Sequence, residues 1–524
     1  MLTLNHLLAD GYFPRELPSA FATTAFASAV TGRKGGLVSA LSGGDQNFSE
    51  LCIHNMVRSG GLRRHLGIPN PVHYSRQCLF VVQNWPALQQ SSQRSPFSLT
   101  QPVDTGEERA ISSAHSLNER TDHRLRLRSG GRFILKADIN RFYSSIYTHS
   151  IPWAIEGKPA VKQAKSDDNL KSIWSNELDY HTRNLNDQQT VGIPIGPDTS
   201  LLLAELVLAA VDEELATKIQ GLRGIRFIDD YEFALNQRSE AEKVVSILQS
   251  ILSKYELALN PWKTKIIELP HSIEPLWTSW IRTSVFRDAG IKGQKNDLTA
   301  FFDNVFVMAK AEPNEDIFKF AIPRFNSVDV REENWTTFQN LLVQCAQVEP
   351  ACLPQVCEQL LHYQSQGRPL DSGLWSACLN QIVTERLPLG QASEALWALW
   401  LMKQLGVAMT SGAEKAIDHC EDSAVALMAL GMAHSGLGNP DSFIRLHTFA
   451  EPSELFGRHW LLCYEGNKQG WLIPPSGADS LGTHPAFDFF RNKNVSFFDI
   501  NAQPTPPRRN APGSQGGVGG GGGY

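Results

Sequence analysis

The chain has 524 residues and a formal net charge of −6 at pH 7. This length predicts two or three domains, and the weak negative charge excludes nucleic-acid binding through an overall positive surface, so a basic groove would have to be local. No run of 18 or more apolar residues and no signal-peptide pattern is present, so we expect a cytoplasmic protein without a membrane span.

The eight cysteines are scattered along the chain, and none forms a Cys-x-x-Cys pair. Zinc sites and disulfide frameworks both need characteristic cysteine spacings, and cytosolic cysteines are usually kept reduced. The cysteines are therefore predicted to be reduced residues of the core.

The first 50 residues predict a loop and a short helix that pack on the body of the protein. Between residues 57 and 85, a basic stretch with Arg63 and Arg64 precedes a proline-containing turn and an apolar run, which predicts a strand, a turn and a helix. An arginine fork donates two hydrogen bonds to a phosphate, so Arg63 and Arg64 are candidate nucleotide ligands. The alternative is a solvated basic loop. Residues 86–119 are polar and predict a long loop or insertion.

The segment Arg124–Arg128 alternates strictly between arginine and leucine. This pattern predicts a strand with one basic and one apolar face. Arg126, on the basic face, is a candidate for lining a nucleotide or template groove. Three solvated arginines are the alternative interpretation.

Two segments end or turn on aspartate. An apolar strand, Phe133 to Ala137, runs into Asp138, and an aromatic pair then opens a helix. Further along, Asp229 and Asp230 lie between two apolar runs, which predicts two strands with the aspartate pair as the turn of a tight hairpin. Carboxylates held in this way are ligands for Mg²⁺ in nucleotide chemistry, although an ordinary surface turn has the same sequence.

The segment between these aspartates ends in a glycine-proline block, residues 192–200. Glycine lets a backbone approach a ligand and proline makes a turn rigid, so Gly192, Pro194 and Gly196 are candidate substrate contacts. An apolar helix is predicted from 201 to 211. The polar stretch up to Asp187 is expected to have a structural role.

After the aspartate pair, residues 239–255 have helical apolar spacing, with Ser239 as the predicted N-cap. Lys263 follows, with Lys265 as a neighbouring alternative.

The blocks around Asp138, Gly192, Asp229 and Lys263 occur in the order and at the spacings of the palm motifs of reverse transcriptases, conventionally lettered A to D. The chain resembles that family over residues 50–270. Its opening and the segment 147–155 resemble the bacterial defence-associated and abortive-infection reverse transcriptases in particular. The glycine block departs from many relatives, with Val191 and Gly196 at positions where those relatives have glutamine and serine.

The resemblance implies an α+β right-hand polymerase with fingers and palm in residues 1–270. It implies two Mg²⁺ ions, replaceable by Mn²⁺, on Asp138, Asp229 and Asp230, with the backbone carbonyl of Ile139 as a further ligand. Lys263 would be the general acid that protonates the leaving pyrophosphate. Tyr143, five residues beyond Asp138, would lie under the sugar and exclude a 2′-hydroxyl, selecting deoxynucleotides.

The C-terminal half, residues 271–500, predicts an all-α domain. Helices are expected at Trp335–Gln347, Ala351–Tyr363, Gly373–Leu387, Ser393–Leu405, Ser423–His434 and Ser453–Tyr464. Their lengths and short polar breaks indicate stacked helical hairpins, and the resemblance implies a HEAT-like thumb replacement that supports oligomers. Residues 501–524 have the Pro/Gly-rich composition of a flexible linker and end in Tyr524, a candidate priming hydroxyl.

The sequence therefore predicts an RNA-directed or untemplated DNA polymerase acting in antiphage defence. Its expected partners are deoxynucleoside triphosphates, the DNA product, a non-coding RNA template where one exists, and further copies of the chain or another defence protein. Two alternatives stay open: an RNA polymerase or terminal transferase with the same palm, and a non-catalytic nucleic-acid-binding scaffold.

Overall fold

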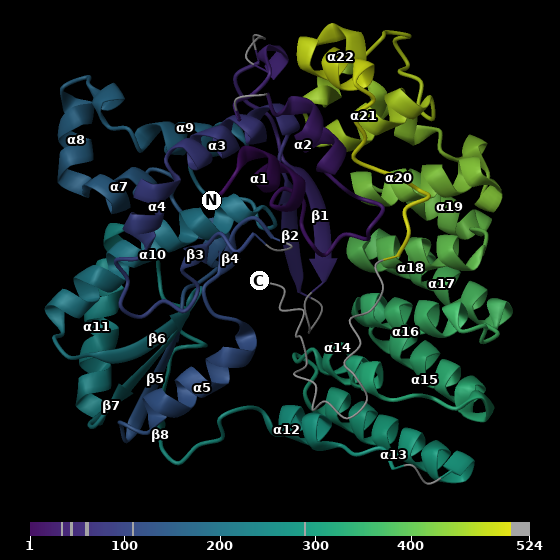
Figure 1. Cartoon of the computed structure of the whole chain (residues 1–524), viewed down its shortest axis with the longest axis horizontal. Helices are drawn as coiled ribbons and strands as arrows, with labels where there is room; N and C mark the ends of the chain where they lie inside the picture. Colours follow the sequence, from purple (N-terminus) through teal and green to yellow (C-terminus); the bar gives the residue numbers. More distant parts are fainter. Residues whose placement is uncertain (33–34, 42–45, 58–61, 107–108, 288–289, 505–524) are drawn as a thin grey trace.

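The computed structural model describes residues 1–32, 35–41, 46–57, 62–106, 109–287 and 290–504. The N-terminal half is mixed α/β and the C-terminal half is helical (Figure 1). The strands are β1 (Cys52–Val57), β2 (Arg63–Ile68), β3 (Pro102–Val103), β4 (Ser112–Ser113), β5 (Phe133–Asp138), β6 (Arg223–Phe227), β7 (Asp230–Leu235) and β8 (Lys265–Glu268).

The helices of the N-terminal half surround these strands. They are α1 (Leu4–Asp10), α2 (Thr24–Val30), α3 (Pro71–Gln83), α4 (Trp85–Ser92), α5 (Leu117–Arg128), α6 (Phe142–Ser145), α7 (Ser150–Glu156), α8 (Lys158–Ser166), α9 (Asn176–Asn184), α10 (Asp198–Lys218) and α11 (Arg238–Lys254). The expected basic strand, proline turn and helix after residue 57 correspond to β2, Pro69 and α3. The predicted long loop of residues 86–119 instead contains most of α4 and the short β3–β4 pair.

The central sheet has four antiparallel strands in the order β6-β7-β5-β8. Side chains alternate between the two faces of β7. Tyr231 bonds Asp212 of α10 on one face, while Glu232 bonds Arg124 of α5 on the other. Helices thus cover both faces of the sheet, which explains why β7 is buried along nearly its whole length.

The segment Arg124–Arg128 is helical, so the predicted strand is wrong. Ser116 and Glu119 form a capping box that starts α5. This local helix signal outweighs the alternation of arginine and leucine. Arg120 and Arg124, one helical turn apart, reach Asp230 and Glu232, two residues apart on β7. Residues four apart on a helix and residues two apart on a strand each lie on one face, so the two arginines can meet the two carboxylates.

Two further local predictions need correction. The hairpin turn is formed by Ile228 and Asp229, since Asp230 already belongs to β7 and pairs with Phe227. The N-cap of α11 is Gln237, which forms a capping box with Glu240; Ser239 lies one residue inside the helix.

The helices of the C-terminal half form an arc from α12, at the bottom of Figure 1, to α22 at the top. They are α12 (Leu276–Thr283), α13 (Gly290–Ala311), α14 (Ile317–Ala321), α15 (Trp335–Val348), α16 (Leu353–Ser365), α17 (Ser372–Arg386), α18 (Ala392–Leu405), α19 (Ser411–Asp418), α20 (Ser423–Met432), α21 (Trp460–Gln469) and α22 (Pro485–Asn492). Five predicted helices match α15 to α18 and α20. The helix predicted at 453–464 instead begins at Trp460, because the preceding residues form 3₁₀ turns.

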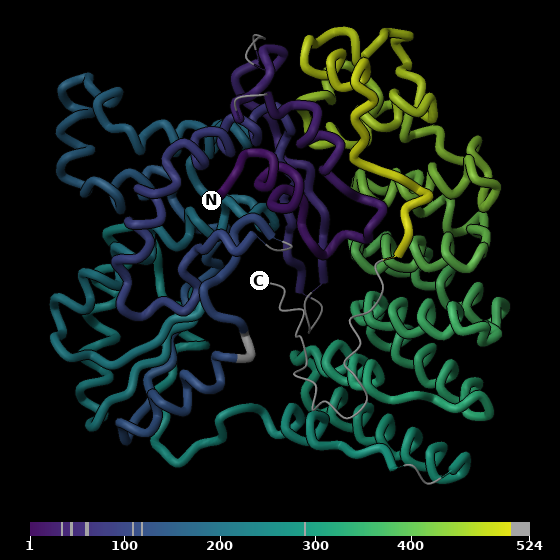
Figure 2. Tube along the Cα trace, viewed as in Figure 1, coloured from purple at the N-terminus to yellow at the C-terminus, as the bar shows by residue number. Residues whose placement is uncertain are grey.

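The C-terminal segment returns to the start of the chain (Figure 2). Ala22 N–H donates to Phe497 O, and Asp499 N–H donates to Ala20 O. Phe497 packs against Phe13, Phe26 and Trp460. This contact ties the two halves together on the side away from the palm sheet.

The interior agrees with the predicted use of cysteine, since all eight thiols are buried and unpaired. In the part of the chain that the structure describes, none of the helices combines the length and the apolar character needed to cross a bilayer.

Candidate active site

The three aspartates of the predicted palm lie at one end of the central sheet. Asp138 ends β5 and pairs directly with Asp230, the first residue of β7. Asp229 occupies the turn just before it, and Ile228 adopts a left-handed φ of 55° that makes this turn tight. The fold thus gathers side chains about 90 residues apart in sequence, as the palm motifs require.

The surroundings of the aspartates are strongly charged. Lys263 Nζ lies 2.8 Å from Asp138 Oδ2, and Arg120 Nη2 lies 3.1 Å from Asp230 Oδ2. Burial, followed by the charges of Asp230 and Asp138, raises the pKa of Asp229 to about 7. Burial also raises the pKa of Asp138, although Lys263 acts in the opposite direction. The carboxylates therefore repel one another, and two cations of the chain only partly offset that repulsion.

This donor set fits divalent cations. Hard ions such as Mg²⁺ prefer carboxylate and carbonyl oxygens and are commonly bound by one or two carboxylates plus substrate phosphates. Among the described residues, no group of three or more His, Cys, Asp or Glu side chains is arranged so that it could hold a metal ion. An open site that relies on the nucleotide for further ligands is compatible with that finding.

The backbone of Ile139 is oriented toward the hairpin. Asn140 N–H donates to Ala258 O, and Asn260 N–H donates to Asp138 O. Ile139 and Leu259 therefore form a non-hydrogen-bonded antiparallel pair, in which the amide and carbonyl of Ile139 point away from Leu259. On the other side of β5 lies β7, which carries Asp230, so this carbonyl can join the carboxylates as an oxygen donor.

A cavity of about 1010 Å³ opens in front of the aspartates. Its lining includes these predicted residues: Arg63, Arg64, Asp138, Ile139, Tyr143, Gly196, Asp229, Asp230 and Lys263. Tyr143 is half-buried and lies edge-on to Phe142. The alternative lysine, Lys265, pairs with Lys136 within the sheet and is not among the cavity residues.

Three predicted contacts lie outside this cavity. Arg126 is exposed on the solvent side of α5, because the helical twist turns it away from the row formed by Arg120 and Arg124. Gly192 packs on the backbone of Ser144, and Pro194 packs on Gly67 of β2. Both residues position the segment rather than line the cavity.

Gly196 lines the cavity and is held in place by an ion pair between Arg109 and Asp198, which the sequence did not predict. Gly196 adopts φ +132°, with Pro14 packed where a side chain would be. Arg109 donates to Gly196 O at 3.1 Å and pairs with the buried carboxylate of Asp198. Asp198 Oδ2 also accepts from Ile111 N–H. This arrangement fixes the glycine-proline block against the segment that contains Arg109 and Ile111.

A second buried network supports the catalytic hairpin. Arg226 is wholly buried, bonds Glu205 and Asp212 of α10, and donates to Ile228 O at 2.7 Å. Ile228 N–H donates to Thr100 Oγ1, which in turn bonds Glu205. The sequence contains a signal for this network, because Glu205 is the charged residue in an otherwise apolar run of α10. A buried charge needs a partner, so a buried cation nearby could have been predicted.

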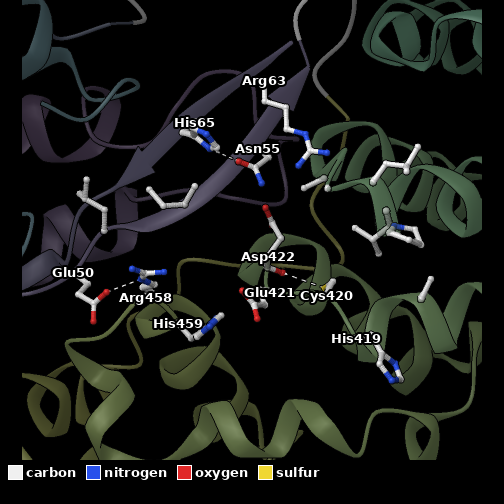
Figure 3. A pocket seen from close by; sticks show the side chains of 18 of the residues that line it. Glu50, Asn55, Arg63, His65, His419, Cys420, Glu421, Asp422, Arg458 and His459 are labelled. Atoms are coloured by element: carbon white, nitrogen blue, oxygen red, sulfur yellow. Dashed lines mark hydrogen bonds and ion pairs between the residues drawn. The ribbon is translucent and has the colours of Figure 1, made fainter. Parts of the chain in front are cut away.

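A separate cavity of about 1210 Å³ lies between β1–β2 and the helical half. Figure 3 shows Arg63 pointing from β2 into it, opposite Asp422. Arg63 also lies against Gly390, where no Cβ would fit. Other charges here are paired, Arg458 with Glu50 and Asp422 with His54. Asp138, Asp229 and Asp230 are not among the residues that line this cavity.

Residues 93–279 match the family model described as "Reverse transcriptase (RNA-dependent DNA polymerase)". This span contains all three aspartates and Lys263, so the chain carries a reverse-transcriptase domain, the catalytic domain of an RNA-directed DNA polymerase. A search of curated proteins gave no significant match.

Solved structures with detectable similarity include apo telomerase from Candida tropicalis, with 12% identity and a TM-score of 0.33 over 69% of this chain and 67% of that one. Another is telomerase from Candida albicans in complex with a TWJ fragment of telomeric RNA, with 13% identity and a TM-score of 0.30 over 67% and 64%. The chain thus spans about two thirds of their length, and TM-scores this low carry no argument about function.

Proposed function

We propose that the protein is an RNA-directed or untemplated DNA polymerase that joins deoxynucleotides with the help of two divalent metal ions. The observation that carries the proposal is the meeting of Asp138, Asp229 and Asp230 at the mouth of one cavity, within the span that matches the reverse-transcriptase model. The raised pKa of Asp229 supports it, since carboxylates that destabilise one another are relieved by a bound cation.

Each residue of the site has a defined part in this reaction. Bound Mg²⁺ or Mn²⁺ would activate the attacking hydroxyl and offset charge on the leaving pyrophosphate. Asp138, Asp229, Asp230 and the carbonyl of Ile139 would hold the ions. Lys263, 57% exposed and paired with Asp138, would then be released toward the nucleotide and protonate the pyrophosphate.

The other residues of the cavity would bind and select the nucleotide. Arg64, on β2, lines the same cavity as the aspartates and would bind the triphosphate. Arg63 lines both this cavity and the separate one and would contact the triphosphate as well. Tyr143 would support the sugar and exclude a 2′-hydroxyl. Gly196 would let the backbone approach the nascent base pair.

We include protein priming by Tyr524 in the proposal. Tyr524 lies outside the described residues, which end at Pro504. Ser19 Oγ donates to Gln503 O, and Pro504 shares a cavity with Arg15, which also lines the catalytic cavity. In this proposal the tail would reach the aspartates from there, past Arg15. Tyr12, a competing candidate, is fully buried and bonded to Pro69 O, so its hydroxyl is inaccessible.

The biological setting is part of the same proposal. The resemblance to defence-associated reverse transcriptases supports a role against phage, with a non-coding RNA, another defence protein or further copies of the chain as partners. Residues 271–500 would replace the thumb as a HEAT-like domain, with the boundary to the palm near residue 270 and the tail from residue 501.

The test uses purified protein, Mg²⁺ and labelled deoxynucleotides, supplied singly and mixed, with and without co-purifying RNA. We expect a polymer that the Asp229→Ala variant does not make. A product whose size falls only after protease treatment indicates protein priming, and it should be lost in Tyr524→Phe. A folded wild-type protein that makes no product under any of these conditions would overturn the proposed function.

A further inference from the structure

A third cavity, of about 840 Å³, is lined mainly by the segment between Asp138 and the glycine block. Helix α8 forms one wall. Lys158, Val161, Lys162 and Lys165 all line this cavity, and their spacing of four, three and seven residues places them on a single helix face. The lysines therefore form a row about 10 Å long.

The cavity is basic, although the whole chain is acidic. The cations that line it are Arg141, Lys158, Lys162, Lys165 and Arg183, and the only acidic residue in its lining is Glu256. Glu256 is 3.7 Å from Lys158, and Arg183 pairs with the buried Asp179. Lys162 and Lys165 are exposed. This cavity is thus locally basic in a chain whose net charge is −6.

The floor of the cavity is aromatic and apolar. Tyr147 packs against Trp153 with ring centroids 5.4 Å apart, and Lys158 lies 4.0 Å above the Trp153 ring. Val191 is 55% exposed beside them. A row of cations next to an aromatic floor is the combination by which proteins bind single-stranded nucleic acid, with phosphates on the cations and bases stacked on rings.

This basic cavity borders the catalytic cavity. Asn140, Arg141 and Ser144 line both. Arg141 adopts a left-handed φ of 48° just after Asp138 and is exposed at the shared edge. Figure 1 shows α8 at the outer edge of the molecule, beyond α7. A strand that followed these residues would pass from the aspartates to the periphery.

We propose that the cavity lined by α8, Arg141 and Tyr147 is a binding groove for single-stranded nucleic acid that enters or leaves the catalytic cavity. The path of the strand relative to the chemistry rests on the proposed function, whereas the binding itself does not. The lysine row holds phosphates, and Tyr147 and Val191 provide the surface on which bases stack. DNA and RNA share this chemistry, so both are tested.

The experiment measures fluorescence anisotropy of labelled single strands of about 15 nucleotides, one of DNA and one of RNA, with the full chain in EDTA so that no polymerisation occurs. The test variant is Lys162→Glu/Lys165→Glu, which alters two exposed side chains. The matched control is Lys243→Glu/Lys292→Glu, which makes the same charge change at exposed helix positions outside the groove.

We expect the test variant to bind at least about 10-fold more weakly, with the salt dependence of log K reduced by about 1.4, the value for two lost phosphate contacts on a single strand. The control should bind like the wild type. Bromodeoxyuridine crosslinks should map to residues 147–191. Equal losses of single-strand affinity in the test and control variants would contradict the proposed groove. Tighter binding of duplex than of single strands would contradict it too.

The readout separates this inference from the proposed function. Weakened binding in Lys162→Glu/Lys165→Glu supports the groove even if the protein never makes a polymer. A wild-type protein that polymerises nucleotides while its single-strand affinity is unchanged by the substitutions contradicts the groove and leaves the polymerase intact.

Discussion

Arg226 and Glu205 form a two-point ion pair beneath the catalytic turn, with Nη1 2.7 Å from Oε1 and Nη2 3.0 Å from Oε2. Both side chains are wholly shielded from solvent, and the same guanidinium donates to Ile228 O. The left-handed backbone of Ile228 is therefore held from below by a side chain two residues earlier. The pair fixes where Asp229 points.

Replacing Arg226 with glutamine should lower the free energy of unfolding by about 3–5 kcal/mol, because Glu205 and Asp212 would remain buried without a counter-charge. Chemical denaturation measures this. Arg132→Gln is the control, since its partner Glu268 is on the exposed surface; its effect should be below about 1 kcal/mol. Equal losses in the two variants would contradict the network.

Asp229→Asn should stabilise the metal-free protein and weaken the effect of magnesium on its stability. The raised pKa of Asp229, about 7, means that the metal-free fold loses stability as pH rises from the ordinary carboxyl range to about 7, and stays penalised above it. In EDTA at about pH 8, the variant should therefore melt higher than the wild type. Added Mg²⁺ should raise the wild-type Tm, by mass action, more than that of the variant.

Asp122→Asn on α5 makes the same chemical change at an exposed position and should respond to Mg²⁺ like the wild type. A wild-type melting curve that is insensitive to Mg²⁺ across the millimolar range would speak against metal binding by these carboxylates.

Lys263 should act by giving up a proton, beyond its pairing with Asp138. Lys263→Ala should lower kcat by about 10²–10⁴-fold, the range of general acid catalysis. Lys263→Arg keeps a positive charge near Asp138, but a guanidinium does not release its proton, so activity should stay low. Lys265→Ala is the control. Full rescue by arginine would mean that Lys263 only positions Asp138.

Tyr143 should set the preference for deoxynucleotides. In Tyr143→Ala the kcat/KM for ribonucleotides should rise relative to deoxynucleotides by about 10–200-fold, the usual discrimination for a steric contact of this size. Tyr143→Phe keeps the ring and should behave like the wild type. The measurement is steady-state incorporation of the two nucleotide series. Unchanged selectivity in the alanine variant would show that Tyr143 does not exclude the 2′-hydroxyl.

The contact between fingers and helical half should depend on pH through His54. Burial lowers the pKa of His54, but the charge and hydrogen bond of Asp422 outweigh it, so the net pKa is raised. A raised histidine pKa gives stability that is complete below the unfolded value and is lost as pH rises through the folded value. Asp422→Asn should therefore lower Tm most at about pH 6 and least at about pH 9.

Asparagine is a good N-cap, so the variant keeps the cap of α20 that Asp422 provides. A Tm difference between Asp422→Asn and the wild type that does not change with pH would show that the charge of His54 is not part of the contact.

The sequence alone determined which segments carry the three candidate aspartates. Asp138 at the end of an apolar strand and Asp229–Asp230 between two apolar runs are local patterns, and strand alternation plus turn chemistry are enough to predict them. Their pairing across β5 and β7 follows from the resemblance to a palm. The burial of the cysteines and five of the C-terminal helices were likewise visible in composition and periodicity.

Only the tertiary structure decided which charges meet. The local capping box makes the segment around Arg124 a helix, but only the packing against β7 gives Arg120 and Arg124 their partners Asp230 and Glu232. Arg109 finds Asp198 across 89 positions, and Arg226 finds Glu205 on another element. The lysines of α8 line a common cavity with Tyr147 only in the folded chain. Periodicity records which face of an element is buried, but the partner on that face is chosen by packing between distant segments, and no local pattern encodes it.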